Sequence, residues 1–295
     1  MKKVLFTGSG VAIVTPFDDN DQVNYALLEK LIDFQIENGT DAIVICGTTG
    51  ESSTLSDEEH VMAIKHTVEY VGGRVPVIAG TGSNETAYAI KLSNDAESAG
   101  VDGLLLVTPY YNKTSQDGLV AHYNFIADRV STPIILYNVP GRTGMTIKPE
   151  TYYELSRNPK IIGTKEASGD ISAIAKMVSL CGDDMPFYSG NDDQITALMS
   201  LGAKGVISVL ANILPKETHD MAAKYLAGDA AGSAELQLKY FDICTDLFID
   251  VNPICIKEAM KMMGWPVGEC RLPLVALNDK NRATLAATLK RHGLI

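Results

Sequence analysis

The stretch GLLLVTPYYNKTSQDGLVAHYNFIADRVSTPIILYN, residues 103–138, carries the pattern from which the fold is predicted. It contains two short apolar runs, residues 103–107 and 134–138, on either side of a stretch with helical periodicity, residues 116–129. Near-continuous apolar runs are typical of parallel strands covered on both faces, whereas half-exposed antiparallel strands alternate apolar and polar residues. Residues 103–138 therefore predict a strand–helix–strand unit of a parallel sheet.

The same alternation extends over most of the chain. Helices are expected at residues 24–37, 56–71, 85–98, 116–129 and 171–180, and the capping-box spacing from Ser56 to Glu59 marks the start of one of them. The expected strands are residues 10–14, 42–46, 75–79, 103–107, 134–138, 161–165, 186–189 and 205–209. Eight such units predict an α/β fold, the closed (β/α)8 TIM barrel.

An open, doubly wound sheet is the alternative to a closed barrel. Such a sheet usually carries a glycine-rich nucleotide-binding turn directly after its first strand. The segment Gly8-Ser9-Gly10 lacks the third glycine of that turn and precedes the first predicted strand. The barrel is therefore favoured.

The chain changes character at about residue 229. Helical stretches follow at residues 230–249, 252–263 and 277–290, with no predicted strand between them. We expect a catalytic barrel of residues 1–228 and a C-terminal helical region of residues 229–295. The boundary shows no low-complexity linker, so the helical region is expected to pack on the barrel.

Composition excludes several classes of function. The 295 residues include 36 Asp and Glu against 25 Lys and Arg, a formal net charge of −11, which disfavours nucleic-acid and membrane-surface partners. No apolar run approaches the length needed to span a bilayer. The basic start MKK would suit a signal peptide, but Gly8, Gly10 and Asp18 interrupt the apolar segment that must follow.

Cysteine and histidine usage gives no sign of disulfides or metal. The five cysteines are odd in number and no two are spaced as Cys-x-x-Cys, which suits a reducing cytoplasm. The five histidines form no paired-ligand pattern, so no metal site is expected. Cys46, just before the Gly47 turn, is interpreted as a core residue.

Polar and glycine-rich segments follow the predicted strands. In a (β/α)8 barrel the active site lies at the C-terminal ends of the strands, so these segments should meet at one mouth of the barrel. They are GTTGE (47–51), GTGSN (80–84), TPYYN (108–112), YNVPGRTG (137–144), KEAS (165–168), SGND (189–192) and IS (207–208).

Lys165 is the most informative of these residues. It ends an apolar strand, so its side chain should enter the barrel mouth, where loss of water favours the neutral amine over the ammonium ion. A neutral amine attacks carbonyl carbons and forms a Schiff base. The alternative is a structural lysine paired with a nearby carboxylate such as Glu166, and position alone does not decide between the two.

Three other positions could support Schiff-base chemistry. Tyr137, at the end of the neighbouring strand, could shuttle protons, although it could equally be a barrel-lining aromatic residue. Thr48 and Thr49 lie beside two glycines and offer hydroxyl and backbone N–H donors for a small carboxylate, or form an ordinary turn. Arg142 provides a forked donor for a substrate carboxylate.

The segments GTTGE, YNVPGRT and KEAS, in this order and spacing, resemble the dihydrodipicolinate synthase family. The likeness runs along essentially the whole chain, including the helical tail. The first and third segments are shared with the wider pyruvate-dependent class I aldolase superfamily, which includes N-acetylneuraminate lyase and 2-keto-3-deoxygluconate aldolase. The Pro-Gly-Arg-Thr segment is narrower and points to the synthases.

The resemblance implies a role for each matched residue. Lys165 would form the imine with pyruvate, and Thr48 and Thr49 would hold the pyruvate carboxylate. Tyr137, Thr49 and Tyr111 would form a proton relay, with Tyr111 donated by a neighbouring subunit of a homotetramer, a dimer of dimers. The remaining implied site residues are Arg142, which would bind the carboxylate of the second substrate, Ile207 through its backbone carbonyl, and Gly190.

The resemblance also implies the reaction. Pyruvate, activated on Lys165, would condense with L-aspartate 4-semialdehyde to give 4-hydroxy-tetrahydrodipicolinate, the first committed step of the diaminopimelate route to lysine. No metal or organic cofactor would be needed. The alternatives are a sibling aldolase acting on a 2-keto-3-deoxy sugar acid, which would share Lys165 and Tyr137, and a catalytically silent binding protein.

Some members of the family are inhibited by lysine at a subunit interface. Two departures in the matching residues, Asp57 in place of a histidine and Tyr88 in place of a glutamate, predict weak or absent inhibition of this chain. Loss of an ion pair at a partly buried site could weaken binding by orders of magnitude. The matching allosteric set is Ser52, Ser53, Asp57, His60, Asn84, Tyr88 and Tyr110.

Two anionic substrates are at first sight a poor match for a chain of charge −11. We therefore expect the acidic excess to lie on outer helices, for example around residues 57–59, while Lys165 and Arg142 make the barrel mouth locally positive.

Overall fold

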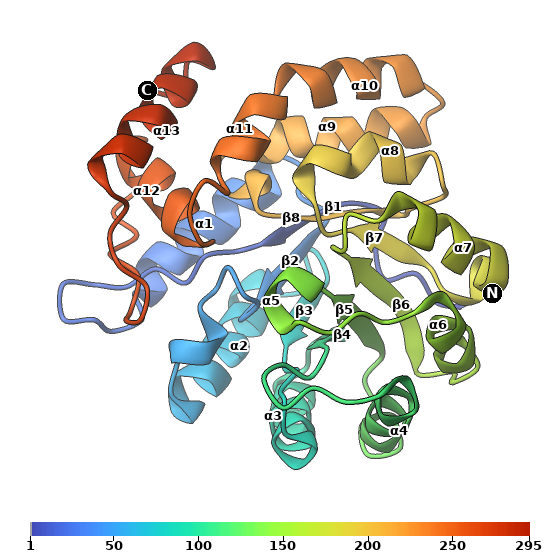
Figure 1. Ribbon diagram of the computed structural model, residues 1–295. Helices are drawn as coiled ribbons and strands as arrows, with labels where there is room; N and C mark the ends of the chain where they lie inside the picture. The colour runs from blue at the N-terminus through green and yellow to red at the C-terminus, as the bar shows by residue number, and fades with distance from the viewer. Residues whose placement is uncertain (1) are drawn as a thin grey trace.

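The computed structural model describes residues 2–295, and its centre is a closed barrel of eight parallel strands (Figure 1). Each strand pairs with the next, and β8 pairs with β1. The predicted (β/α)8 barrel is therefore confirmed. The strands are β1 (Gly8–Ala12), β2 (Ala42–Ile45), β3 (Val77–Gly80), β4 (Gly103–Val107), β5 (Ile134–Asn138), β6 (Ile161–Glu166), β7 (Phe187–Ser189) and β8 (Gly205–Ser208).

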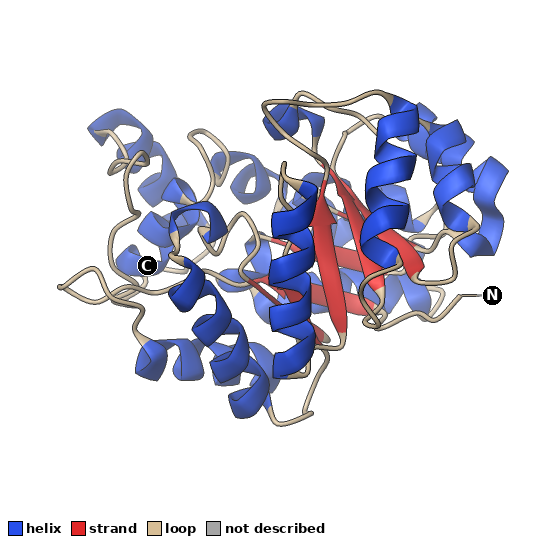
Figure 2. Ribbon diagram, turned by 90° about the horizontal axis from the view of Figure 1, so that it is seen from below, coloured by secondary structure: helices blue, strands red, loops and turns tan. Residues whose placement is uncertain are grey.

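Helices surround the strands (Figure 2) and connect each strand to the next. In the barrel part of the chain they are α1 (Tyr25–Glu37), α2 (Asp57–Val71), α3 (Thr86–Ala99), α4 (Gln116–Ala127), α5 (Pro140–Thr143), α6 (Pro149–Ser156), α7 (Ile171–Cys181), α8 (Ile195–Met199) and α9 (Pro215–Leu226). Ser56 caps α2 through the capping box with Glu59 that the sequence predicts.

The first strand differs from its prediction by two residues. It was expected at residues 10–14 because those residues are apolar, but it begins at Gly8, which pairs with Gly205 where β1 and β8 close the barrel. A Cβ atom on Gly205 would lie 1.8 Å from the carbonyl oxygen of Gly8, and both glycines have positive φ angles. Close approach of the two backbones, rather than apolar character, therefore sets where this strand begins.

Apolar side chains form two separate layers. The larger lies between the strands and the helices, and the smaller fills the inside of the barrel with residues such as Phe6, Ile135, Tyr188 and Ile207. The rings of Phe6 and Tyr188 stack with their centroids 4.4 Å apart, and the Tyr188 hydroxyl donates to the Phe6 carbonyl. The interior is thus packed below the mouth, which leaves the polar side chains at the strand ends as the accessible ones.

The C-terminal region consists of helices that lie beside the barrel (Figure 1). They are α10 (Ala230–Lys239), α11 (Phe241–Asp246), α12 (Ile254–Met262) and α13 (Asp279–Arg291), so the first expected helix, 230–249, is broken at Tyr240. Their buried residues, among them Ile243, Ile256 and Leu285, belong to the same apolar layer as the barrel helices. The division at residues 228 and 229 stays a prediction. None of the helices within residues 2–295 is long and apolar enough to cross a membrane.

Candidate active site at the barrel mouth

Lys165 is the penultimate residue of β6, lies inside the barrel and is only 5% exposed. In the sheet register it lies between Tyr137 of β5 and Tyr188 of β7, and its Nζ atom is 4.5 Å from the centre of the Tyr137 ring. Gly190 leaves room for this side chain, because a Cβ atom there would lie 3.1 Å from Lys165 Cε and 2.7 Å from Ala167 Cβ. The three predicted site residues Lys165, Tyr137 and Gly190 therefore lie together.

Glu166 does not neutralise Lys165. Neighbouring residues of a strand face opposite sides of the sheet, and the Glu166 carboxylate points outward, where it accepts hydrogen bonds from Asn138, Tyr152 and the backbone of Ser168. Among the ion pairs of residues 2–295, none includes Lys165. The alternative of a structural Lys165–Glu166 pair is therefore wrong. No carboxylate oxygen of residues 2–295 forms an ion pair with the amine within 4.0 Å, but the charge of Lys165 is close enough to oppose the desolvation that raises the pKa of the buried Asp192 carboxyl group.

Thr48 and Thr49 follow β2 and lie at the same mouth. Thr49 is 2% exposed, and its Oγ1 atom accepts a hydrogen bond of 3.0 Å from the side-chain amide of Asn252. Within residues 2–295, no hydrogen bond joins Thr49 to Tyr137, so the relay inferred from the resemblance is not closed in this structure. Thr48 faces a cavity of about 310 Å³ that Arg142 also lines.

Arg142 lies in α5, the single helical turn that follows β5. The guanidinium group donates a hydrogen bond of 2.9 Å from Nη2 to the backbone carbonyl of Asn252, and the side chain borders the cavity. Pro140 begins α5 and Gly144, with a φ angle of 63°, ends it, so the sequence Pro-Gly-Arg-Thr-Gly encodes a short fixed turn. Arg142 is thus held over the mouth with donors left for a ligand.

Tyr111 lies apart from the other predicted catalytic residues. Its side chain is 90% exposed and its φ angle is 67°, a left-handed conformation that is uncommon for a non-glycine residue. Within residues 2–295 of one chain, no hydrogen bond or aromatic contact joins Tyr111 to Lys165, Tyr137 or Thr49. Ile207, in contrast, is fully buried in β8 with its side chain in the inner layer of the barrel. The role expected for its carbonyl stays a prediction.

Most of the allosteric set lines the same cavity as Thr48 and Arg142. Ser52, Ser53, His60, Tyr88 and Tyr110 all face it. His60 is buried, and its Nε2 atom donates to the Gly80 carbonyl at 2.9 Å, while desolvation lowers the pKa of its imidazole. Five residues of the set therefore share a cavity with Thr48 and Arg142, while Lys165 and Tyr137 are not among the residues that line it.

The side chains of Asp57 and Tyr88 are hydrogen-bonded to each other. The Tyr88 hydroxyl donates to Asp57 Oδ1 at 2.5 Å, and the ammonium group of Lys91 lies 2.9 Å from Asp57 Oδ2. The hydrogen bond from Tyr88 and the contact with Lys91 lower the pKa of the Asp57 carboxyl group, and burial next to that carboxylate raises the pKa of Tyr88 to about 12. An approaching ammonium group would meet a carboxylate that Lys91 already neutralises.

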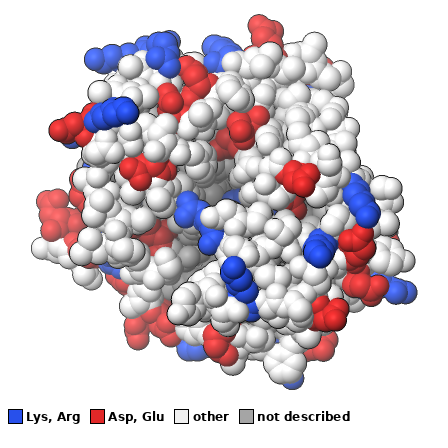
Figure 3. Space-filling view, in the orientation of Figure 1, with Lys and Arg blue, Asp and Glu red and all other residues white. Residues whose placement is uncertain are grey.

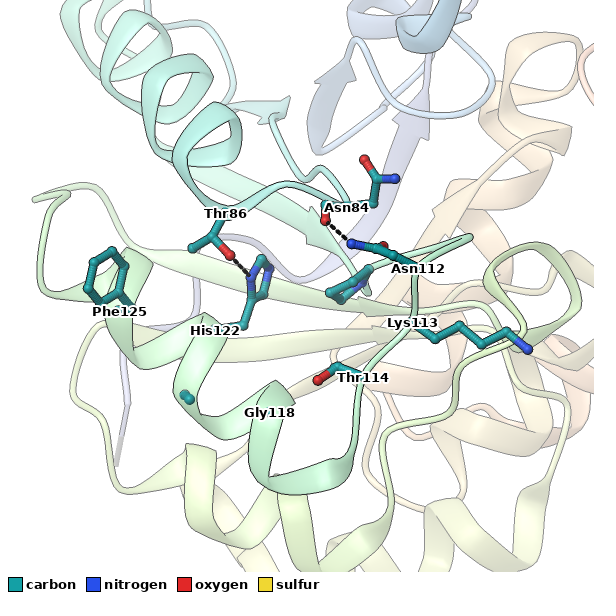
Figure 4. Close-up of a pocket in the computed structure, with 10 residues that line it drawn as sticks. Asn84, Thr86, Asn112, Lys113, Thr114, Gly118, His122 and Phe125 are labelled. Carbon is teal, nitrogen blue, oxygen red and sulfur yellow. Dashed lines mark hydrogen bonds between the residues drawn. The ribbon is translucent and has the colours of Figure 1, made fainter.

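Asn84 belongs to a different cavity, of about 440 Å³, between α3 and α4 (Figure 4). Its backbone carbonyl accepts a hydrogen bond from the side chain of Asn112. In the same cavity His122 contacts the Thr86 hydroxyl, and desolvation lowers the pKa of this histidine to about 4. Asn84 therefore lines a different cavity from the one that Ser52, Ser53, His60, Tyr88 and Tyr110 line, although its neighbour Ser83 borders the latter.

Metal ligands do not gather at the mouth. Within residues 2–295, no three His, Cys, Asp or Glu side chains lie where they could bind one metal ion. Cys46 is fully buried, and burial raises the pKa of its thiol far above the ordinary value, which supports its interpretation as a core residue.

On the face that carries α5, Lys and Arg side chains border a hollow near the centre (Figure 3).

Comparison with known proteins agrees with this geometry. The model of the dihydrodipicolinate synthetase family matches residues 5–292. The chain belongs to this family. It is 52% identical to the 4-hydroxy-tetrahydrodipicolinate synthase of Acetivibrio thermocellus over the full length of both chains. It is 55% identical to the enzyme of that name from Clostridium tetani over 99% of each chain.

One solved structure is also similar to this chain in fold. The chloride-inhibited dihydrodipicolinate synthase from Acinetobacter baumannii complexed with pyruvate superposes with a TM-score of 0.96 and 44% sequence identity, covering 98% of this chain and all of that one. As a member of the dihydrodipicolinate synthetase family, the chain is an enzyme, a lyase of the class I aldolase type.

The sequence did not predict one of the residues at the barrel mouth. Asn252 lies in the C-terminal region, far from the predicted strand ends, yet it contacts both Thr49 and Arg142. In the sequence it is the first residue of the expected helix 252–263, whereas the structure begins α12 at Ile254. The Asn-Pro pair at 252–253 indicates a helix boundary, but no pattern in the sequence indicates that this boundary reaches the barrel mouth.

Proposed function

We propose that this chain condenses pyruvate with L-aspartate 4-semialdehyde through a Schiff base on Lys165 and releases 4-hydroxy-tetrahydrodipicolinate. Family membership and relatives at 52% and 55% identity support this reaction, which belongs to the biosynthesis of lysine through diaminopimelate. The observation that carries the assignment to Lys165 is its amine, buried beside Tyr137 and without a carboxylate partner.

In the first half of the reaction, the neutral amine of Lys165 attacks the keto carbon of pyruvate. The carbinolamine loses water and gives the imine, and loss of a proton from the methyl carbon gives the enamine. Each of these steps moves a proton, and we assign these transfers to the hydroxyl groups of Tyr137 and Thr49. Thr48 and Thr49 hold the pyruvate carboxylate.

In the second half, the enamine carbon attacks the aldehyde carbon of the semialdehyde. The amine of that substrate then attacks the imine carbon, closes the ring and expels Lys165 as a free amine. One water is lost overall, so no oxidant, reductant or external cofactor is consumed. Arg142 binds the semialdehyde carboxylate, because its guanidinium group lies over the cavity with donors to spare.

Tyr111 would complete the relay only from another subunit. Its 90% exposure supports the proposal that it enters a neighbouring site in a homotetramer. Sedimentation of the chain and of Tyr111→Arg tests this. A tetramer that Tyr111→Arg dissociates with loss of kcat supports it, and a fully active monomer contradicts it.

Borohydride reduction in the presence of pyruvate tests the proposed function. We expect a pyruvate adduct on Lys165 by peptide mass mapping, and turnover of aspartate semialdehyde in a coupled assay. Absence of the adduct would contradict the Schiff base. An adduct without semialdehyde turnover would support the sibling aldolase acting on a 2-keto-3-deoxy sugar acid, a reading that the relatives do not favour.

A further inference from the structure

A cavity of about 220 Å³ lies on the outer side of β5 and β6, between these strands and the helices α6 and α7. The two helices lie side by side next to β6 (Figure 1). Three apolar side chains, Ile147, Ile174 and Met177, form part of the cavity wall, and the Glu166 carboxylate belongs to its polar part. The cavity is separate from the barrel mouth, because Lys165 lies inside the barrel and is not among the lining residues.

The Glu166 side chain places a negative charge in this wall and is only 2% exposed. Its carboxylate accepts hydrogen bonds from Asn138 Nδ2 at 3.0 and 3.1 Å, from the Tyr152 hydroxyl at 2.8 Å and from the Ser168 N–H at 2.9 Å. The Asn138 amide is oriented by its other end, since its Oδ1 accepts the N–H of Ile147. Both carboxylate oxygens therefore face N–H donors, as an ionised carboxylate requires.

No cation balances this buried carboxylate. None of the ion pairs within residues 2–295 includes Glu166, and its donors are all neutral groups. Neutral donors stabilise a negative charge but do not cancel it, and buried charges in proteins are usually paired with an opposite charge. The negative potential of Glu166 therefore extends into the cavity that it borders.

The remaining charge at the cavity is also negative. Asp170 is exposed at its edge, where Oδ1 accepts the N–H of Ala173 as the cap of α7, and Oδ2 accepts no hydrogen bond within residues 2–295. Within the same residues, no Lys, Arg or His lines the cavity. Lys176, which is also on α7, is paired with Glu150 at 2.7 Å. A positively charged occupant is thus the one that the cavity complements.

The wall favours an organic cation over a metal ion. Within residues 2–295, no three His, Cys, Asp or Glu side chains could bind one metal ion, and the four bonds to Glu166 already occupy its lone pairs. An ammonium group needs only nearby negative charge and acceptors such as the Ser168 hydroxyl and Asp170 Oδ2. The apolar wall would cover a short hydrocarbon chain. Drug-sized ligands occupy cavities of about 300 Å³ or more, so the occupant is smaller.

We propose that this outer cavity binds a small organic cation, a primary ammonium group on a short apolar chain, with the ammonium beside Glu166 and Asp170. The ligand has no carboxylate, because no cation in the wall would pair with one. The inference does not depend on the proposed function. Because Glu166 and Lys165 face opposite sides of β6, an occupant of this cavity leaves the barrel mouth open to substrates.

Calorimetric titration of the full chain with n-butylammonium chloride at constant ionic strength tests the proposal. We expect one saturable site per chain with a Kd on the order of 1 mM, in keeping with the binding energy available to so few atoms. The uncharged 1-butanol and the anion butyrate have similar shapes. Both should bind at least about tenfold more weakly, because they lose the attraction to the carboxylates.

Matched variants locate the bound cation. Glu166→Gln removes the buried charge with little change in shape, so the affinity for n-butylammonium should fall at least about tenfold. Asp170→Asn should cost about threefold, since this carboxylate is exposed and asparagine still caps α7. The control is Glu154→Gln, at an exposed position of α6 outside the cavity wall, and its affinity should be unchanged.

Ala173→Leu blocks the cavity without changing its charge. This variant should abolish saturable binding, and it keeps the proposal testable if Glu166→Gln does not fold. Urea unfolding of each variant shows whether lost binding reflects lost structure. The variant also separates a cation inside the cavity from cations attracted to the surface of a chain with net charge −11.

Three results would overturn the inference. The first is no saturable binding by the parent protein at about ten times the expected Kd. The second is equal affinity for n-butylammonium and 1-butanol. The third is parental affinity in both Glu166→Gln and Ala173→Leu, or an equal loss in Glu154→Gln, since either would place the cation on the acidic surface.

Discussion

Lys165 and Lys257 are both buried lysines, and the difference between them lies in their partners. Lys165 is 5% exposed and Lys257 1% exposed, and each ammonium group lies over an aromatic ring, that of Tyr137 at 4.5 Å and that of Phe17 at 4.3 Å. Lys257 also has the Glu51 carboxylate at 2.8 Å, whereas no carboxylate pairs with Lys165 within residues 2–295.

The two lysines are thus equally buried but differ in what their amines contact. The Glu51 carboxylate holds Lys257 in an ion pair, whereas Lys165 lies beside Tyr137 without a carboxylate in ion-pair contact. We expect only the second arrangement to support Schiff-base chemistry. The predictions below test whether this single difference separates a catalytic lysine from a structural one.

The largest expected effect is on activity. Lys165→Met should lower kcat/KM by at least about 10³-fold, the scale on which loss of a covalent nucleophile acts, and should abolish the borohydride adduct. Lys257→Met should still form the adduct on Lys165. Peptide mass mapping of both variants measures this, and labelling of Lys257 by pyruvate in the parent enzyme would contradict the comparison.

The next largest effect is on stability. Lys257→Met leaves the Glu51 carboxylate buried and unpaired, which should lower the free energy of unfolding by about 3–5 kcal/mol. Urea denaturation measures the change, and Lys165→Met should show little of it. The double variant Lys257→Met, Glu51→Gln should recover part of the loss. A loss below about 1 kcal/mol would mean that the pair behaves as a surface ion pair.

The two aromatic rings below the amines should also differ. Tyr137→Phe keeps the ring and removes the hydroxyl, so kcat should fall about 10²-fold if Tyr137 transfers protons. Phe17→Leu should instead lower the free energy of unfolding by about 0.5–3 kcal/mol with kcat little changed. Steady-state kinetics and urea unfolding of both variants decide this, and an unchanged kcat in Tyr137→Phe would restore its interpretation as a barrel-lining residue.

The charge network around Lys257 should contribute a small pH dependence. Hydrogen bonds from Arg271 lower the pKa of Glu59, so this carboxylate stabilises the fold above its ordinary pKa and loses that contribution as the pH falls through the lowered value. We expect Arg271→Met to reduce the loss of stability on acidification below about pH 4.5. Urea midpoints measured from pH 3 to pH 7 would contradict this if both proteins lost stability in parallel.

The smallest expected effect concerns a third lysine, the exposed Lys91, which neutralises Asp57. Free L-lysine at sub-millimolar concentration should leave activity nearly unchanged, because its ammonium group would meet Lys91 and the neutral Tyr88 hydroxyl. The combined variant Tyr88→Glu, Lys91→Met should be more sensitive. Half inhibition of the parent enzyme in this range would show that the substitutions at 57 and 88 do not prevent binding.

The sequence predicts well those features that depend on local pattern. The predicted bounds of β4 and β5 agree with the observed ones at both ends, and the Ser56–Glu59 capping box is confirmed. Both predictions succeed because apolar runs and capping spacings act within a few residues. The start of β1 was wrong because it depends on contact between Gly8 and Gly205, about which neighbouring residues carry no information. The expected helix 230–249 is divided at Tyr240 into α10 and α11.

In the candidate site, too, some residues could be predicted from the pattern of strands, and others depend on contacts between distant parts of the chain. Lys165, Tyr137, Gly190, Thr48 and Arg142 could be predicted because a barrel brings the ends of its strands to one mouth. Asn252 and Lys257 could not, because they reach Thr49 and Glu51 across about two hundred residues of chain. Whether Glu166 pairs with Lys165 also needed the structure, which shows their side chains on opposite sides of β6.

The contact between β1 and β8 has a consequence for biosynthesis. A ribosome makes the chain from its N-terminus, so Gly8 emerges long before Gly205 and has no partner until the eighth strand is released. During that interval the partial sheet has two open edges, β1 and the newest strand, and both can pair with other nascent chains.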